Sequence, residues 1–124
     1  MCLSLFKEET KKRKAKKPIA CYKVLVEYRS TDGDNTLLIV SPIHHYVWNR
    51  IYMQETKIKI SYREYLPSAI TITEGFHAFC NEEDALEAVG NRSVYKMIIP
   101  QGSTYYTEGK HIVSNRMTLV RKIK

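Results

Sequence analysis

The 124-residue chain has little cysteine and no long apolar run, and each shortage excludes a class of protein. Its three cysteines, Cys2, Cys21 and Cys80, follow no metal-ligand spacing, and their odd number argues against a disulfide framework. No stretch approaches the roughly eighteen apolar residues of a membrane helix, and the opening MCLSLF is too short for the core of a signal peptide. We therefore expect one soluble, cytoplasmic domain with reduced thiols and no membrane contact.

Net positive charge is missing from the body of the chain, although the whole chain is +7. Residues 1–17 carry seven basic and two acidic side chains, a net +5, and the end adds +3 from Arg121, Lys122 and Lys124. Residues 18–120 hold ten basic and eleven acidic side chains, a net −1. We expect residues 1–17 to form a basic, mobile tail and residues 18–124 a single globular domain. The tail is either simply solvated or an arm that binds phosphates and nucleic acid.

Alternation of apolar and polar residues predicts that most of the chain is strand. The segment 20–41 reads as a hairpin turning at DGDN, and STYY is expected to pair with HIVS across TEGK. Asn81 is expected to cap a short helix over about 81–90, with three acidic residues in its first turn. Residues of about 42–53 fit a second helix or a strand equally well. The predicted fold class is α+β, mainly an antiparallel, strongly curved or split β-sheet with one short helix.

Sequence signatures of catalysis are also missing, since no GxSxG, Walker or GxGxxG pattern occurs. The adjacent His44 and His45 point apart on a strand or a helix, so they make a poor metal pair. His77 and His111 lack carboxylate or cysteine neighbours at ligand spacing. We expect no metal and no cofactor.

Aromatic residues supply the candidate binding site, because nine tyrosines are many for so short a chain. In GFHAF, Phe76 and His77 precede the predicted helix, and His77 is either a packing residue or the wall of a cleft beside the helix N-terminus. Tyr105 and Tyr106 face opposite sides of a strand, and Tyr106 is the ring expected to stack on a ligand. The alternative is that one ring of this pair lies in the core and the other is half-exposed.

The order of ACYKVL, GFHAFC, NEEDALEAV, YKMIIPQG and HIVSNRMTLV resembles the ADP-ribosyltransferase fold. The resemblance covers about the C-terminal half and the first strand, and it implies NAD as a substrate. The first strand has Tyr22-Lys23 where that family has an arginine or histidine followed by glycine. The last strand has Asn115-Arg116-Met117 where the catalytic glutamate is expected, and Glu108 is the nearest acid. If the fold is shared, the resemblance implies a chain without the family's catalytic residues.

The segments MCL, GFHAF, EDA and YKMIIPQGSTYY also resemble small uncharacterised proteins of phages and gut bacteria. That resemblance implies a protein acting in the host cytoplasm on host defence. Our leading hypothesis is a non-catalytic binding protein that sequesters a nucleotide-like, phosphate-bearing immune signal, either NAD-derived or a cyclic nucleotide. The rival hypotheses are a mono-ADP-ribosyltransferase-like enzyme and an accessory protein that binds nucleic acid or a protein through the tail. Homo-oligomer formation is left open. The expected ligand-binding residues are Tyr22, Lys23, Phe76, His77, Tyr106 and Arg116.

Overall fold

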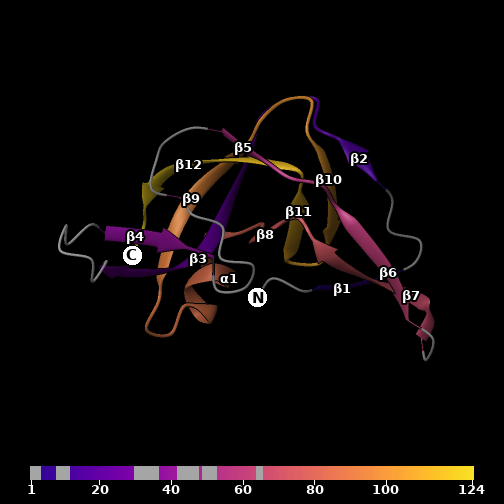
Figure 1. The fold of residues 1–124 in the computed structure, drawn as a ribbon, viewed down its shortest axis with the longest axis horizontal. Helices are drawn as coiled ribbons and strands as arrows, with labels where there is room; N and C mark the ends of the chain where they lie inside the picture. The colour runs from indigo at the N-terminus through magenta and orange to yellow at the C-terminus, as the bar shows by residue number, and fades with distance from the viewer. Residues whose placement is uncertain (1–3, 8–11, 30–36, 42–47, 49–52, 64–65) are drawn as a thin grey trace.

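The structure is a computed structural model that describes residues 4–7, 12–29, 37–41, 48, 53–63 and 66–124. These residues form many strands and one helix (Figure 1). In chain order the elements are β1 (Ser4–Lys7), β2 (Arg13–Lys14), β3 (Ile19–Arg29), β4 (Leu37–Val40), β5 (Met53–Glu55), β6 (Lys59–Arg63), β7 (Leu66–Glu74), β8 (Phe76–Phe79), α1 (Glu82–Ala88), β9 (Ser93–Ile99), β10 (Thr104–Glu108), β11 (His111–Ser114) and β12 (Arg116–Lys122).

The described strands make two sheets in which every pairing is antiparallel. The small sheet has the order β1-β7-β6, and the large one has the order β2-β10-β11-β8-β3-β9-β12-β5, with β4 attached to β3. Figure 1 shows the small sheet at one end of the molecule, beyond β10 and β11. The prediction of a mainly antiparallel fold with one short helix is confirmed.

Both predicted hairpins form. Strand β3 pairs with β4 from Val26↔Val40 to Arg29↔Leu37, and β10 pairs with β11 from Tyr105↔Ser114 to Glu108↔His111. The turn of the second hairpin contains Gly109 at a φ of 58°, a left-handed conformation that glycine adopts without steric cost. Alternating side chains and a turn residue were therefore sufficient signals for these local pairings.

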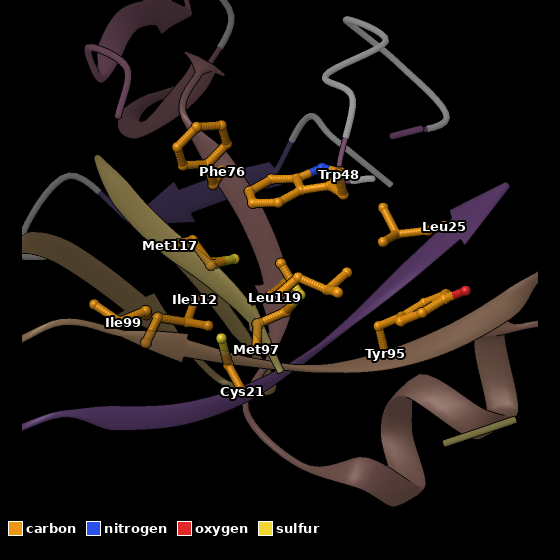
Figure 2. Packing of buried hydrophobic residues seen from close by; sticks show 11 residues of the cluster. Cys21, Leu25, Trp48, Phe76, Tyr95, Met97, Ile99, Ile112, Met117 and Leu119 are labelled. Carbon is orange, nitrogen blue, oxygen red and sulfur yellow. The ribbon is translucent and has the colours of Figure 1, made fainter. Parts of the chain in front are cut away.

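Strand β3 lies at the centre of the large sheet, and its side chains alternate between the two faces of that sheet. It pairs with β9 at every position from Ile19↔Ile99 to Leu25↔Ser93. Alternation along β3 sends Cys21 and Leu25 into the main core, which also contains Trp48, and sends Val24 to the other face. Figure 2 shows the main core, in which the Trp48 ring meets Phe76 edge-on at a centroid distance of 5.0 Å.

Helix α1 covers the opposite face of the sheet from the main core. Its buried Ala85 and the adjoining Val89 pack with Val24, Phe79 and Val94 to form a second core, which we call the helix-side core. The helix begins within a residue of the predicted start, but Asn81 makes no side-chain cap hydrogen bond. Asn81 does occupy the predicted N-cap position, but its amide donates to the Asp84 carboxylate at 3.3 Å and not to the cap, so the expected cap hydrogen bond is absent. Packing on the sheet, and not capping, holds this short helix.

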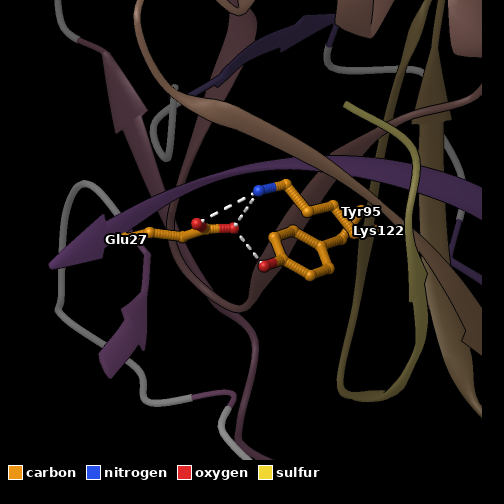
Figure 3. A network of polar contacts seen from close by, with 3 residues as sticks. All are labelled: Glu27, Tyr95 and Lys122. Carbon is orange, nitrogen blue, oxygen red and sulfur yellow. Dashed lines mark hydrogen bonds and ion pairs between the residues drawn. The ribbon is translucent and has the colours of Figure 1, made fainter. Parts of the chain in front are cut away.

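A polar cluster ties together three neighbouring strands at one edge of the core (Figure 3). The Tyr95 hydroxyl of β9 donates to the Glu27 carboxylate of β3, and the Lys122 ammonium of β12 lies 3.0 Å from the same carboxylate. The hydrogen bond from Tyr95, followed by the contacts with Lys122, lowers the pKa of Glu27. Lys122 is half-exposed, so the ion pair itself contributes little to stability.

The N-terminal segment differs from the expected tail, because parts of it pair with the body. Strand β1 pairs with β7 from Ser4↔Ile72 to Lys7↔Ala69, and β2 pairs with β10 at Thr104↔Lys14 and Tyr105↔Arg13. A charge run predicts solvation from composition alone, whereas these pairings depend on partners distant in sequence. Of residues 42–53, Trp48 lies outside helix and strand and Met53 begins β5; the remaining ten, with His44 and His45, lie outside the described residues.

Candidate functional site

The structure brings two of the six predicted ligand-binding residues into direct contact. Lys23 on β3 is 3% exposed and His77 on β8 is 4% exposed. The Lys23 ammonium donates to the His77 carbonyl oxygen at 2.5 Å. Strands β3 and β8 pair only at Tyr22↔Phe79, so they diverge before His77, and Lys23 satisfies a carbonyl that the sheet leaves unpaired.

The His77 ring is held neutral by its surroundings. Burial first, and then the nearby Lys23 charge, lower its pKa to about 3, against the raising effect of the Gly75 and Ile72 carbonyls. Its Nδ1 lies 3.2 Å from the Gly75 carbonyl oxygen, so in the neutral ring Nδ1 carries the proton and donates. Nε2 has no hydrogen-bond partner among the described residues. The ring is therefore a buried, neutral group.

Tyr106 lies on the same face as His77, as the stacking hypothesis requires, but it is buried. Tyr106 is opposite Val113, and Val113 is opposite His77, and cross-strand neighbours share a face. Tyr106 is 7% exposed and packs with Ile72 and Val113 in a small apolar cluster. This placement matches the alternative in which one tyrosine ring of the pair lies in the core.

The remaining predicted residues belong to other clusters or contacts than His77 does. Phe76 is in the main core, on the face opposite to His77, as neighbours on a strand must be. Tyr22 packs against the helix-side core. Arg116 donates to the Gln101 carbonyl oxygen at 3.3 Å, at the turn between β9 and β10. The six residues therefore do not line a common cleft.

The helix N-terminus is surrounded by acidic groups. A pocket of about 550 Å³ there is lined by Asn81, Glu82, Glu83 and Asp84. Three carboxylates would repel a phosphate more strongly than the end of a two-turn helix would attract it. The charges around this terminus therefore do not favour a phosphate in the cleft that the sequence suggested beside it.

A second pocket, of about 480 Å³, is rich in positive charge. We call it the basic pocket, and it is lined by Arg13, Lys14, Lys16, Lys17, Ile19 and Tyr105. All four cationic residues are exposed, whereas the Tyr105 ring is partly buried against the main core. Among the described residues, no carboxylate forms an ion pair with any of the four. The pocket thus presents positive charge, without a paired carboxylate in the described part of the chain, beside an aromatic ring.

Backbone hydrogen bonds at Ala15 hold the basic pocket in place. The Ala15 amide donates to the Ser103 carbonyl at 2.8 Å, and its carbonyl accepts from the Gly102 amide at 2.8 Å. Ala15 is 3% exposed, so its small side chain faces inward while Lys14 and Lys16 are exposed. A residue with a larger side chain would not fit in the place of Ala15 without displacing the turn.

Arg116 adds a further cation close to the same turn. A Cβ placed on Gly102 would lie 3.0 Å from the Arg116 guanidinium, so this side chain covers the turn that binds Ala15. Of the six predicted residues, Arg116 is thus the one adjacent to the basic pocket. Sequence reasoning missed Tyr105 as a pocket residue, because it treated the basic run as separate from the body. The pairing Tyr105↔Arg13, which joins them, has no local sequence signal.

Comparisons with protein-family models, with curated proteins and with solved structures find no match to this chain. The resemblances to ADP-ribosyltransferases and to phage proteins therefore stay predictions. Within the described part of the chain, no group of three or more histidine, cysteine, aspartate or glutamate side chains could hold a metal ion. No helix there is long and apolar enough to cross a membrane.

Proposed function

We propose that the protein is a non-catalytic binding protein for a phosphate-bearing, nucleotide-like ligand, which it holds in the basic pocket. The observation that carries this proposal is the gathering of four cations, none of them paired with a described carboxylate, around the partly buried ring of Tyr105. Arginine and lysine bind phosphate oxygens through charge-assisted hydrogen bonds. An aromatic face stacks on a base and contributes about 1–3 kcal/mol. The pocket offers both kinds of contact within one space.

The biological setting of the proposal comes from the resemblance to small phage proteins. A phage protein that binds a nucleotide without consuming it would act by sequestering a host immune signal. An NAD-derived nucleotide and a cyclic dinucleotide both carry phosphates and bases, so both fit the chemistry of the basic pocket. The other route, catalysis on NAD, would need a carboxylate to replace the glutamate that is missing from Asn115-Arg116-Met117.

Binding measurements with matched variants test this proposal. We expect ADP-ribose or a cyclic dinucleotide to bind the wild-type chain in calorimetry, and the Lys16→Glu/Lys17→Glu variant to lose at least about tenfold in affinity, or roughly 1.4 kcal/mol. Lys110→Glu is the control, since Lys110 is exposed and does not line the pocket. Equal losses in the two variants would show only a general effect of charge, and an absence of binding by any nucleotide in the panel would overturn the proposal.

The two neighbouring tyrosines give a second test of the same site. Tyr105→Ala should weaken nucleotide binding by about 1–3 kcal/mol, because its ring lines the basic pocket. Tyr106→Ala should leave the affinity unchanged and lower the unfolding free energy, since Tyr106 is buried in the small apolar cluster. The reverse pattern would place the ligand beside His77. Incubation with NAD should release no nicotinamide.

A second candidate function is binding of single-stranded nucleic acid, and the shape of the cationic segment favours it. The four basic residues follow one another within residues 13–17, so they present charge along a line instead of around a point. An oligonucleotide would be expected to bind with an affinity that falls steeply as salt rises. A mononucleotide that binds more tightly than oligothymidine at two salt concentrations would exclude this candidate.

A further inference from the structure

Cys21 on β3 and Cys80, the residue after β8, each adjoin the one pair that joins their strands at the centre of the large sheet. Strands β3 and β8 are antiparallel and pair at Tyr22↔Phe79. In an antiparallel pair, the residue before Tyr22 is opposite the residue after Phe79. Continuing the register by one residue would therefore set Cys21 opposite Cys80. Cross-strand neighbours on one face approach more closely than any other residues of two strands.

Both thiols point to the same face of the sheet. Cys21 belongs to the main core, where Figure 2 shows its sulfur among Met97 and Ile112. Cys80 packs against the same core, in line with Phe76 and Ala78, which alternate onto that face of β8. A thiolate at Cys80 would also raise the pKa of Cys21 further, as expected for close groups.

The backbone around Cys80 also sets the separation of the pair. The Cys80 amide donates to the Lys110 carbonyl at 2.9 Å, so its peptide group points toward the β11 side of β8 and away from β3. Opposite Cys21 this makes a non-hydrogen-bonded pair, the type in which Cα atoms lie about 4.5 Å apart. Disulfides span Cα separations of about 4.4–6.8 Å. Extended by one residue beyond Tyr22↔Phe79, the register would place the two residues within reach of a disulfide.

We propose that Cys21 and Cys80 are a modification site that a disulfide oxidant, such as oxidised glutathione, converts to a cross-strand disulfide. Cys80 is the partly exposed member, so it reacts first. It loses its proton, its thiolate attacks one sulfur of the oxidant, and the oxidant's S–S bond breaks to release one glutathione thiol. Cys21 then loses its proton and attacks the Cys80 sulfur, which releases the second glutathione thiol. Two protein thiols lose two electrons and two protons, and one glutathione disulfide gains them.

The surroundings make this reaction slow at neutral pH. Burial raises the pKa of Cys21 to about 12, and burial with the nearby Asp84 carboxylate raises the pKa of Cys80. Since the thiolate is the attacking species, both steps should accelerate as pH rises. The product would join β3 to β8 one residue from the Tyr22↔Phe79 pair, on the side away from the contact between Lys23 and His77. The site therefore acts as a lasting lock on the sheet and not as a fast sensor.

Mass spectrometry of the full chain tests the assignment. The protein is incubated with oxidised glutathione at pH 8.5, quenched with acid, alkylated and digested. We expect a species that has lost two hydrogens, a linked peptide pair containing Cys21 and Cys80, and an alkylated or glutathionylated Cys2. Oxidation should raise the melting temperature by roughly 5–15 °C, and reduction should reverse the shift.

Single variants separate the proposed pair from other thiol chemistry. Cys2→Ala should form the linked peptide as the wild type does, whereas Cys21→Ala should stop at a glutathione adduct on Cys80. Cys80→Ala should leave the buried Cys21 unmodified in the folded protein. A wild-type chain that accumulates only the Cys80 adduct, or that links Cys2 to either partner, would overturn the proposal, and so would a linked species that melts no higher than the reduced one.

Discussion

Lys23 and His77 show how a polar contact replaces a pair of the sheet. Beyond Tyr22↔Phe79, toward His77, the strands β3 and β8 no longer pair. The His77 carbonyl there accepts a hydrogen bond from the Lys23 ammonium and not from a backbone amide of β3. A buried carbonyl without any partner would cost about 1–3 kcal/mol. The sequence predicted that Lys23 and His77 belong together, as parts of a binding site. The structure brings them together as a buried support for the sheet.

The neutral His77 should make the protein sensitive to acid. Its folded pKa of about 3 lies below an unfolded value of about 6.5, so between these values the unfolded state binds more protons. Stability from this residue is fully present above about pH 6.5 and is lost as pH falls toward 3, with a slope of up to about 1.4 kcal/mol per pH unit. Urea unfolding at pH 7, 6 and 5 measures this slope, and His77→Gln should reduce it.

His111→Gln is the control for that measurement. The pKa of His111 is also lowered, by burial first, but its ring is half-exposed and its contribution to the slope should be smaller. Curves of wild type and His77→Gln that run parallel between pH 7 and 5 would contradict the assignment of His77 as a buried neutral group.

At the scale of elements, Gly75 makes the junction between the two sheets. It separates β7 of the small sheet from β8 of the large one, at a φ of 138° that other residues rarely adopt. A Cβ at this position would lie 2.8 Å from Val113 Cγ1, closer than packed atoms approach. The chain can pass from one sheet to the other at this place only because the residue has no side chain.

Gly75→Ala should therefore destabilise the protein by about 2–4 kcal/mol, through backbone strain and a steric clash with Val113. Gly109→Ala is the matched control, because Gly109 also has a positive φ but nothing lies within 4 Å of its added Cβ. It should cost only about 1 kcal/mol. Denaturant titration compares the two variants, and similar losses would show that the contact with Val113 does not constrain the junction.

Helix α1 should depend on its packed face and not on its first residue. Asn81→Ala should cost less than about 0.5 kcal/mol, since Asn81 makes no cap hydrogen bond. Val89→Ala should cost about 1–3 kcal/mol, because it removes buried methyl groups from the helix-side core. Chemical denaturation of both variants shows whether the packed face or the Asn81 cap stabilises the helix. A loss of unfolding free energy above about 1 kcal/mol for Asn81→Ala would instead support the side-chain cap that the sequence predicted.

At the scale of the whole molecule, residues 2–17 should contribute to stability as well as to binding. Their removal would eliminate the pairing of β1 with β7 and of β2 with β10. It would also remove the hydrogen bonds that the Ser103 carbonyl and the Gly102 amide make with Ala15. We expect a loss of at least about 2 kcal/mol in unfolding free energy, measured by urea titration. A mobile tail would instead leave the melting temperature unchanged.

A charge variant separates the two contributions of this segment. Arg13→Gln/Lys16→Gln/Lys17→Gln keeps the backbone pairing with β10, so it should unfold like the wild type while losing nucleotide binding. If this variant and the deletion were equally unstable, charge and not pairing would govern the stability of the segment.

The sequence predicted those parts of the fold that depend on near neighbours. The hairpins of β3 with β4 and of β10 with β11, and the position of α1, follow from alternation, turn residues and an acidic first turn. Alternation also placed Tyr105 and Tyr106 on opposite faces. Which ring is buried depends on what covers each face, and Tyr106 is covered by Ile72 of β7, far away in sequence. The basic pocket escaped prediction for the same reason.

The pairing of β2 with β10 has a consequence for the order of events during synthesis. Arg13 and Lys14 leave the ribosome long before Thr104 and Tyr105, the residues that hold them in the sheet. Contacts between distant segments form late, because the intervening chain must first be ordered. A nascent chain that lacks residues 104 and 105 carries the same cations but no basic pocket. Specific phosphate binding would thus begin only when translation is nearly finished.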